Sequence, residues 1–335
     1  MVPQIDAKCE SSAWQKELAS MITDPQELWQ LLALDATLLP AAQQAAALFP
    51  LRATRSYVSR MRQGDVNDPL LQQVLPLGLE LQPMAGYSQD PLQEAKARKV
   101  PGLLHKYRDR ALLMLTGACA VHCRYCFRRH FPYADNTLTP ATWQPALAYL
   151  AEQSQIKEVI LSGGDPLVVK DVLLDELLQE LAKIKHLQRV RIHTRLPIVL
   201  PSRITVELLQ TLTRTRLPVV MVLHSNHAQE INSEVQQVCY AMRTANLHLL
   251  NQTVLLKNIN DNVETLIELS EVLFNVGVLP YYLHMLDAVD GAAHFAVSEV
   301  LAKELIVMMK SNLPGYLVPK LVREVAGHPS KLEVI

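Results

Sequence analysis

The feature that most constrains the fold is a regular alternation of short apolar runs and longer amphipathic stretches from residue 111 onward. Runs of β-prone residues predict strands, and apolar positions spaced by three or four residues predict helices. The predicted strands are 111–116, 158–162, 190–194, 218–224, 247–255 and 279–284, and the predicted helices are 140–152, 171–184, 205–213, 233–245, 262–275 and 298–310. Six strand–helix units in series predict an α/β fold with a parallel sheet and right-handed crossovers.

The periodicity leaves two α/β architectures open. Six units are too few to close an eight-unit barrel, so a doubly wound sheet and an open six-stranded partial barrel both remain. The chain before residue 96 differs, because 25–33 and 41–49 have helical spacing and four prolines then interrupt the pattern between residues 69 and 91. We therefore expect a helical N-terminal extension (1–95), an α/β region (96–315) and a C-terminal segment (316–335).

Composition excludes several classes of protein. The 335 residues include 32 Lys and Arg against 33 Asp and Glu, a formal net charge of −1, which argues against a broad electrostatic surface for nucleic acid or anionic membrane. The N-terminal residues lack the layout of a secretory signal, and no apolar run reaches the roughly 18 residues of a membrane-spanning helix. Five unevenly spread cysteines do not form a disulfide framework. We expect a cytoplasmic protein that binds neither nucleic acid nor membrane.

Polar or glycine residues follow every predicted strand. In chain order the strand ends carry GACAVHCRYCFRRH, SGGDP, HTRLP, LHSNH, NQT and HMLD. In parallel α/β folds, functional sites form where the carboxyl ends of the strands meet. One shared site at that edge explains all six sequences together, whereas the alternative is six ordinary polar loops.

Three cysteines in the first of these loops suggest a metal centre. Cys119, Cys123 and Cys126 are separated by three and two residues, so all three thiolates can turn toward one soft metal centre. An iron–sulfur cluster held by three cysteines leaves one iron open to a ligand. A zinc site completed by His122 and His130 is the alternative. Cys9 and Cys239 have no assigned role.

The cysteine spacing, with Tyr125 just before the third cysteine, resembles the motif of the radical S-adenosylmethionine enzymes. The adjacent glycines Gly163 and Gly164, followed by Asp165, are similar to the motif with which that superfamily meets the methionine amino group of S-adenosylmethionine. Without the resemblance, the same residues also suit an ordinary turn from strand to helix.

Longer motifs, in order, resemble one family within this superfamily. The sequences HKYRDRALLMLTGACAVHCRYCFRRHF, SGGDPL, NQTVLLKNIND, PYYLHMLD and GYLVPKLVREVAGHPSK resemble the lysine 2,3-aminomutase family over roughly residues 95–335. The GYLVPKL and HPSK stretches are most similar to the short bacterial branch that makes (R)-β-lysine for modification of elongation factor P. The resemblance implies a partial (β/α)6 TIM-like barrel, a 4Fe–4S cluster, S-adenosylmethionine and pyridoxal phosphate.

The resemblance also implies roles for individual residues. The cluster ligands would be Cys119, Cys123 and Cys126. The contacts to S-adenosylmethionine would come from Gly163, Gly164, Asp165, His224 and Gln252. Pyridoxal phosphate would form a Schiff base with Lys331, and its phosphate would lie near Lys106 and Arg110. Substrate lysine would be bound through its carboxylate by Arg128 and through its distal ammonium by Asp287 and Glu324.

Three positions depart from the family pattern: Glu324 stands where Asp is usual, Lys106 where Arg is usual and His284 where Tyr is expected.

The implied partners are L-lysine, an electron donor such as flavodoxin or ferredoxin, and a functional link to elongation factor P and its lysyl ligase; homodimer formation is left open. A related aminomutase acting on glutamate or another amino acid, or on free lysine for metabolism, is an alternative. A non-enzymatic iron–sulfur or zinc-binding scaffold is another.

Overall fold

A single ten-stranded sheet organises the computed structural model, which describes residues 13–139 and 142–335. Cys9 lies outside the described residues. The strands, which lie side by side in chain order, are β1 (Arg98–Val100), β2 (Leu103–Tyr107), β3 (Arg110–Thr116), β4 (Glu158–Gly163), β5 (Arg189–Thr194), β6 (Val219–His224), β7 (His248–Val254), β8 (Leu279–His284), β9 (Lys320–Arg323) and β10 (Leu332–Glu333).

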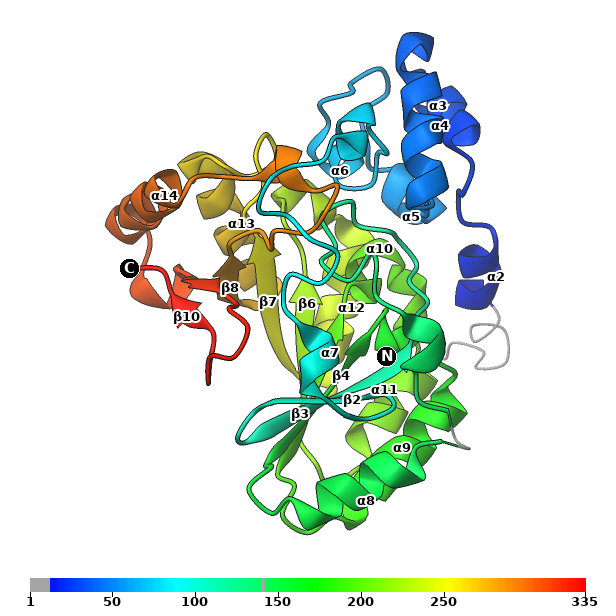
Figure 1. The fold of residues 1–335 in the computed structure, drawn as a ribbon, viewed down its shortest axis with the longest axis vertical. Helices are drawn as coiled ribbons and strands as arrows, with labels where there is room; N and C mark the ends of the chain where they lie inside the picture. The colour runs from blue at the N-terminus through cyan, green and yellow to red at the C-terminus, as the bar shows by residue number, and fades with distance from the viewer. Residues whose placement is uncertain (1–12, 140–141) are drawn as a thin grey trace, which may run out of the picture.

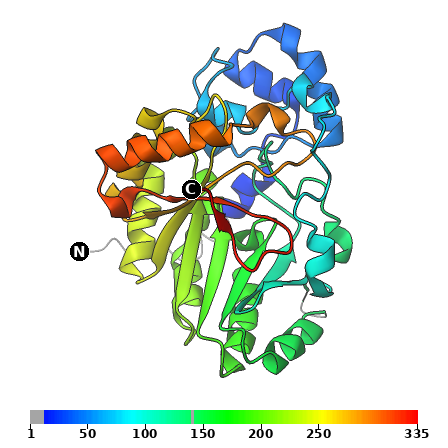
Figure 2. The same ribbon diagram turned by 60° about the vertical axis from the view of Figure 1, so that its left-hand side comes forward.

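The strand order decides between the two architectures. From β3 to β9 every strand pairs in parallel with the next one in the sequence. A doubly wound sheet needs a reversal of strand order from its centre. Without a reversal, right-handed crossovers put all the connecting helices on one face, and the sheet curves into an open barrel (Figures 1 and 2). The predicted partial barrel is confirmed, and β9 adds a seventh parallel strand that the sequence analysis lacked.

Four of the barrel helices begin at a residue whose side chain caps the helix. The helices of the barrel are α8 (Gln144–Glu152), α9 (Asp171–Lys183), α11 (Val206–Thr213), α12 (Ser233–Thr244), α13 (Val263–Asn275) and α14 (Glu299–Asn312), with the short α10 (Leu196–Val199) after β5. The side chains of Thr205, Asn232, Asn262 and Ser298 each accept a hydrogen bond from a backbone N–H of the following helix. Helix α8 begins at Gln144, after the undescribed residues 140–141.

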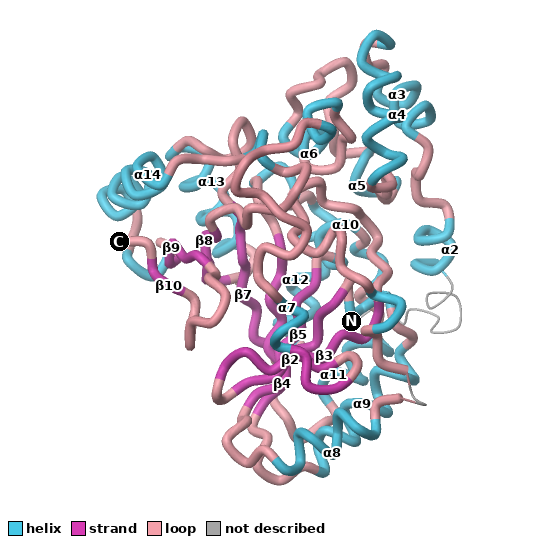
Figure 3. The backbone as a smooth tube through the Cα atoms, in the orientation of Figure 1, coloured by secondary structure: helices cyan, strands magenta, loops and turns pink. Residues whose placement is uncertain are grey.

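The N-terminal helices pack against the barrel at the end where the parallel strands finish (Figures 1 and 3). They are α2 (Ala13–Ala19), α3 (Pro25–Leu32), α4 (Leu39–Leu48), α5 (Arg55–Val58), α6 (Pro69–Gln72) and α7 (Glu94–Ala97). Trp29 and Leu70 from these helices belong to the same buried hydrophobic cluster as Leu113 and Val159 from the sheet. Because this core is continuous, the N-terminal helices and the barrel stabilise each other.

The C-terminal residues return to the sheet. Strand β10 pairs antiparallel with β9 and crosses in front of the sheet (Figure 2). Lys331 lies immediately before β10, in the connection between these two strands. Among the helices of the described residues, none combines the length and the apolar character needed to cross a membrane.

Candidate active site

One cavity of about 360 Å³ opens among the strand ends, the cysteine loop and the β9–β10 connection. Its wall includes all of the residues that the sequence analysis assigned to a site, namely Cys119, Cys123, Cys126, Gly163, Gly164, Asp165, His224, Gln252, Lys106, Arg110, Arg128, Asp287, Glu324 and Lys331. These residues lie more than two hundred positions apart at the extremes of the sequence. The parallel strands bring them together because the carboxyl ends of the strands lie at one edge of the sheet.

The cysteine loop follows β3 and is fixed by the N-terminal segment. The backbone N–H of His122 donates to the carbonyl oxygen of Arg52 at 3.0 Å, and that of Arg124 donates to the carbonyl oxygen of Gln73 at 2.9 Å. The guanidinium of Arg124, which has no exposed surface, donates to both carboxylate oxygens of Glu80 at 2.8 and 2.6 Å. The loop is therefore held by residues that the sequence analysis treated as an irregular connection.

The three thiols of this loop are free and partly exposed at the cavity wall. Burial raises the pKa of the Cys126 thiol to about 11, so binding of a metal centre there must release a proton. Within the described ranges, no three His, Cys, Asp or Glu side chains converge on a point where one metal ion could bind. An iron–sulfur cluster binds several thiolates through different irons, so its ligands need not converge in that way.

His122 and His130, considered for zinc, lie in other surroundings. The Nδ1 atom of His122 lies 2.7 Å from the carbonyl oxygen of Pro50, and its ring stacks on Phe49 with centroids 4.8 Å apart. His130 is exposed. Neither of these histidines lines the cavity that the three thiols face.

The glycine pair at the end of β4 lets two backbones come together. Gly163 has a φ of +116°, which disfavours any side chain. A Cβ on Gly164 would lie 2.3 Å from the carbonyl oxygen of Ala118, just before the first cysteine. The backbone N–H of Gly164 donates to the carbonyl oxygen of Thr116 at 2.7 Å. These glycines therefore place the cysteine loop directly against β4.

Asp165 joins the ends of β4 and β5. Its two carboxylate oxygens accept hydrogen bonds from the Thr194 hydroxyl at 2.7 and 3.0 Å and from the backbone N–H groups of Arg195 at 2.7 Å, Leu196 at 3.1 Å and Leu167 at 3.1 Å. Burial raises its pKa. With both oxygens occupied by the protein, Asp165 shapes the cavity wall.

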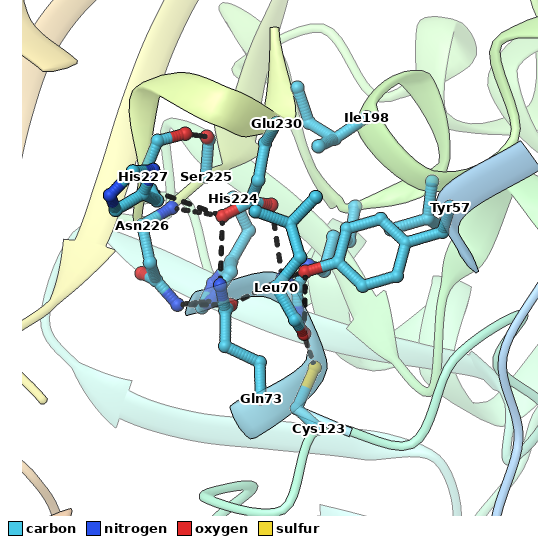
Figure 4. Close-up of polar contacts among 12 residues, drawn as sticks. Tyr57, Leu70, Gln73, Cys123, Ile198, His224, Ser225, Asn226, His227 and Glu230 are labelled. Atoms are coloured by element: carbon cyan, nitrogen blue, oxygen red, sulfur yellow. Dashed lines mark hydrogen bonds and ion pairs between the residues drawn. The ribbon is translucent and has the colours of Figure 1, made fainter. Parts of the chain in front are cut away.

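His224, at the end of β6, meets the cysteine loop. Its Nε2 atom lies 2.9 Å from the hydroxyl of Tyr125, and the two rings stack with centroids 5.7 Å apart. Asn226 donates to the same hydroxyl at 2.7 Å and to Gln73 at 2.9 Å. Figure 4 shows His224, Asn226 and Gln73 pointing toward one another beside Cys123. Gln252 lines the cavity from the neighbouring strand β7.

The cavity wall also holds a chain of alternating charges. Arg128 donates through Nε and Nη2 to the two oxygens of Glu94 at 2.7 and 2.9 Å. Lys106 Nζ bridges Glu94 at 3.0 Å and Glu324 at 2.8 Å, and Lys331 Nζ donates to the second oxygen of Glu324 at 2.6 Å. Four of these five residues are predicted from the sequence; Glu94 is not, since a single acid outside any longer periodic element leaves no signal.

These pairs set the ionisation of the acids. Burial by itself would raise the pKa of Glu94 and of Glu324, but the neighbouring cations outweigh it and lower both pKa values. Asp287 makes no ion pair with the described residues; burial, with Glu324 adding to it, outweighs the opposing effect of Lys331 and Lys106 and raises its pKa to about 7. Of these three acids, Glu94 and Glu324 are therefore ionised at neutral pH, and the charge of Asp287 changes near it.

The remaining candidates lie around this charged group. Arg110 donates to Asp109 at 2.9 Å, and its guanidinium lies 4.4 Å from the centroid of the Tyr107 ring. Burial lowers the pKa of His193, and burial with Lys331 lowers that of His284 to about 3, so both imidazoles are neutral. The Nε2 atoms of both histidines have no hydrogen-bond partner among the described residues.

Comparison with known proteins places this barrel in a superfamily. The Radical SAM superfamily matches residues 113–270, which run from β3 into α13 and include the three cysteines. In this chain the matched region is the partial barrel with the three-cysteine loop after its first parallel strand.

Full-length relatives are more specific. L-lysine 2,3-aminomutase of Escherichia coli (strain K12) is 50% identical over 319 residues, covering 95% of this chain and 93% of that protein. The enzyme of the same name from Haemophilus influenzae is 47% identical over 331 residues, covering 99% and 98%. That of Clostridium subterminale is 35% identical over 323 residues, covering 96% and 77%. The chain belongs to the L-lysine 2,3-aminomutase family, a family of isomerases within the radical SAM superfamily.

Membership implies three cofactors: a 4Fe–4S cluster, S-adenosylmethionine and pyridoxal phosphate. The cavity residues fit such groups chemically. Three free thiols line the cavity, as cluster binding requires, and so does Lys331, whose amine can bind a carbonyl cofactor covalently.

Proposed function

We propose that this protein converts L-α-lysine to (R)-β-lysine. The observation that carries the proposal is the cavity whose wall contains three free thiols together with an amine, Lys331, and the acids Glu324 and Asp287. The thiols of Cys119, Cys123 and Cys126 hold the cluster, and Lys331 holds pyridoxal phosphate. When bound, the cluster with S-adenosylmethionine supplies hydrogen-atom abstraction, and pyridoxal phosphate supplies the conjugated system across which an amino nitrogen can move.

The protein's own residues bind and orient the substrate. Glu324 already binds an alkylammonium, because Lys331 Nζ donates to it at 2.6 Å, and the distal ammonium of lysine has the same chemistry. Asp287 supplies a second acid to that ammonium. Arg128 binds the substrate carboxylate through Nη1, the atom that does not pair with Glu94 and that donates to the Ser162 hydroxyl at 3.2 Å when no substrate is bound. Lys106 and Arg110 provide the positive charge that a cofactor phosphate needs.

The methionine part of S-adenosylmethionine is bound, in this proposal, at the cysteine side of the cavity. His224 and Gln252 supply polar contacts from β6 and β7. Gly163 and Gly164 allow the ligand to approach the backbone, and Asp165 shapes that wall.

The test is anaerobic turnover of the reconstituted protein with L-lysine, S-adenosylmethionine, pyridoxal phosphate and a reductant. We expect β-lysine in the wild type and none in Lys331→Ala. Lys320→Ala is the matched control, because Lys320 pairs with Glu333 on the surface and does not line the cavity. Borohydride should attach pyridoxal phosphate to the peptide that contains Lys331. A wild type that carries a full cluster but turns over glutamate and not lysine would contradict the proposal.

We further propose a cellular role: the product is used to modify elongation factor P in the cytoplasm, through a lysyl ligase. The support is the resemblance of the GYLVPKL and HPSK stretches to the branch with that role. In a bacterium without its own aminomutase, the wild-type chain should restore the β-lysyl mass on elongation factor P, whereas Lys331→Ala should not. Flavodoxin or ferredoxin as electron donor, homodimer formation and the division into 1–95, 96–315 and 316–335 stay predictions.

A further inference from the structure

Arg195, the residue after β5, touches a cysteine of the proposed cluster site. Only 6% of its surface is exposed. Its Nη1 atom donates to the sulfur of Cys123 at 2.8 Å and to the hydroxyl of Tyr125 at 2.9 Å. A guanidinium cannot lose its proton in a protein, so this sulfur has a permanent positive charge beside it.

The other end of the guanidinium is fixed by residues from distant parts of the chain. Its Nη2 atom donates to the hydroxyl of Tyr57 at 3.1 Å, to the side-chain oxygen of Gln73 at 2.5 Å and to the carboxylate of Glu230 at 3.0 Å. Tyr57 lies in α5 and Gln73 directly after α6. Figure 4 shows Tyr57, Gln73 and Glu230 converging beside Cys123. The N-terminal segment therefore reaches the surroundings of this cysteine.

Glu230, which has no exposed surface, is itself held in place. One of its oxygens accepts hydrogen bonds from the backbone N–H groups of Asn226 at 2.8 Å and His227 at 3.1 Å and from Gln73 at 3.2 Å, and the other accepts from Arg195. A buried cation is stable only with such a fixed counter-charge and fixed acceptors. The guanidinium therefore has one position, and that position faces the sulfur.

A fixed donor at a ligand sulfur has a definite electrostatic consequence. Reduction adds negative charge to an iron–sulfur cluster, and hydrogen bonds to its sulfurs and nearby positive charge stabilise that reduced form. Burial strengthens the effect because little water screens it. Glu230, as the negative partner, acts in the opposite direction.

We propose that Arg195, held by Tyr57, Gln73 and Glu230, is a positioning residue that fixes Cys123 and raises the reduction potential of the cluster. This inference rests on the proposed function, because it requires the cluster to be bound at the three cysteines. It also gives the N-terminal segment a role, which is to supply two of the acceptors that hold the guanidinium against the sulfur.

The experiment measures the midpoint potential of the reconstituted full chain by electron paramagnetic resonance during a redox titration, without lysine or S-adenosylmethionine. Arg195→Met should lower the potential enough to change the ratio of reduced to oxidised cluster at least tenfold, which corresponds to about 59 mV for one electron. Arg195→Lys should fall between Met and wild type. Glu230→Gln should raise the potential. Opposite shifts from two neighbouring residues are not expected if both only support packing.

Arg203→Met is the matched control. Arg203 is also buried and pairs through Nη2 with a carboxylate, Asp171, while Nε and Nη2 also donate to the carbonyl oxygens of Leu167 and Val169. Its loss should lower the melting temperature as Arg195→Met does and leave the potential unchanged. If Arg195→Met does not fold, Arg195→Lys and Glu230→Gln still decide the question.

Two failures are distinguishable. If the wild type binds no cluster, the proposed function fails first. If the wild type binds the cluster and makes β-lysine, but the Arg195→Lys and Glu230→Gln variants have the wild-type potential at full cluster content, this inference alone is wrong.

Discussion

At the scale of residues, the charged side of the cavity is an alternating chain in which each side chain is defined by its neighbours. Arg128, a residue that sequence motifs assign to a substrate carboxylate, is paired with a carboxylate of the protein, Glu94. Lys106 and Lys331 both meet Glu324. Motifs named most of these positions, but no motif states which charge faces which.

Asp287 predicts a pH dependence of stability. Burial raises its pKa from 3.8 to about 7 in the folded protein, so the folded state holds a proton that the unfolded state has lost. Its stabilising contribution is complete below pH 4 and is lost as pH rises toward 7. Asp287→Asn lacks this pH-dependent contribution to the free energy of unfolding. Without cofactors, the stability of the variant relative to wild type should therefore increase as the pH is raised from 5 to 8.

Denaturant unfolding at the two pH values measures this difference. Glu152→Gln, which changes an exposed carboxyl at the end of α8, should show no such change with pH. A constant difference between Asp287→Asn and wild type would contradict the prediction.

Glu324 predicts a graded loss of activity. Glu324→Gln removes a charge-assisted hydrogen bond, which is worth about 1.5–3 kcal/mol, so we expect kcat/KM for lysine to fall roughly 10- to 100-fold. Glu324→Asp keeps the charge and should lose less. Glu333→Gln, at the exposed partner of Lys320, should leave kcat/KM unchanged. Steady-state kinetics of the enzyme with its cofactors bound measures these values. Equal kcat/KM for the Gln and Asp variants would contradict the prediction.

At the scale of elements, the site depends on how the end of β4 meets the cysteine loop. Gly163 and Gly164 remove the side chains that would separate the two backbones, and Asp165 then ties β4 to the end of β5. From the sequence, these glycines are predicted to serve either the approach of a ligand or a turn. The structure adds a third use, which is close packing of the backbone that carries the cysteines.

Gly164→Ala tests this packing. The new Cβ would lie 2.3 Å from a backbone oxygen, so the cysteine loop must move, and we expect reduced iron content and a lower melting temperature. Gly315→Ala is the control, since a Cβ there has no atom of the described structure within 4 Å. Full iron content in Gly164→Ala would show that the loop tolerates the shift.

At the scale of the whole molecule, the N-terminal segment and the barrel form one structure. Glu80, in the 3₁₀ helix Gly78–Leu81, pairs with Arg124 at 2.6 Å and with Arg129 at 2.7 Å, and these two arginines flank the last cysteine of the loop. All three side chains are almost fully buried. Removing one partner of such a pair leaves an unpaired charge in the protein interior.

Glu80→Gln should therefore destabilise the protein by about 3–5 kcal/mol or more, because it leaves two buried cations without their anion. Arg124→Met should cost less, since Glu80 keeps Arg129. Glu27→Gln, at an exposed ion pair with Arg55, should change stability by less than about 1 kcal/mol. Chemical unfolding measures all three, and equal losses for Glu80→Gln and Glu27→Gln would contradict the argument.

The sequence by itself determined the elements and the place of the chemistry. Periodicity predicted six of the seven parallel strands and the six longer barrel helices to within a few residues, because it reflects local backbone geometry and one buried face; it missed β9 and the short α10. The motifs after the strands named residues that share one cavity, because parallel strands end at one edge. Only the tertiary structure decided that the sheet is singly wound, that Glu94 pairs with Arg128, and that Tyr57 and Gln73 reach Arg195. Those contacts join side chains far apart in the chain, and a buried polar contact between distant residues leaves no periodic pattern from which it could be predicted.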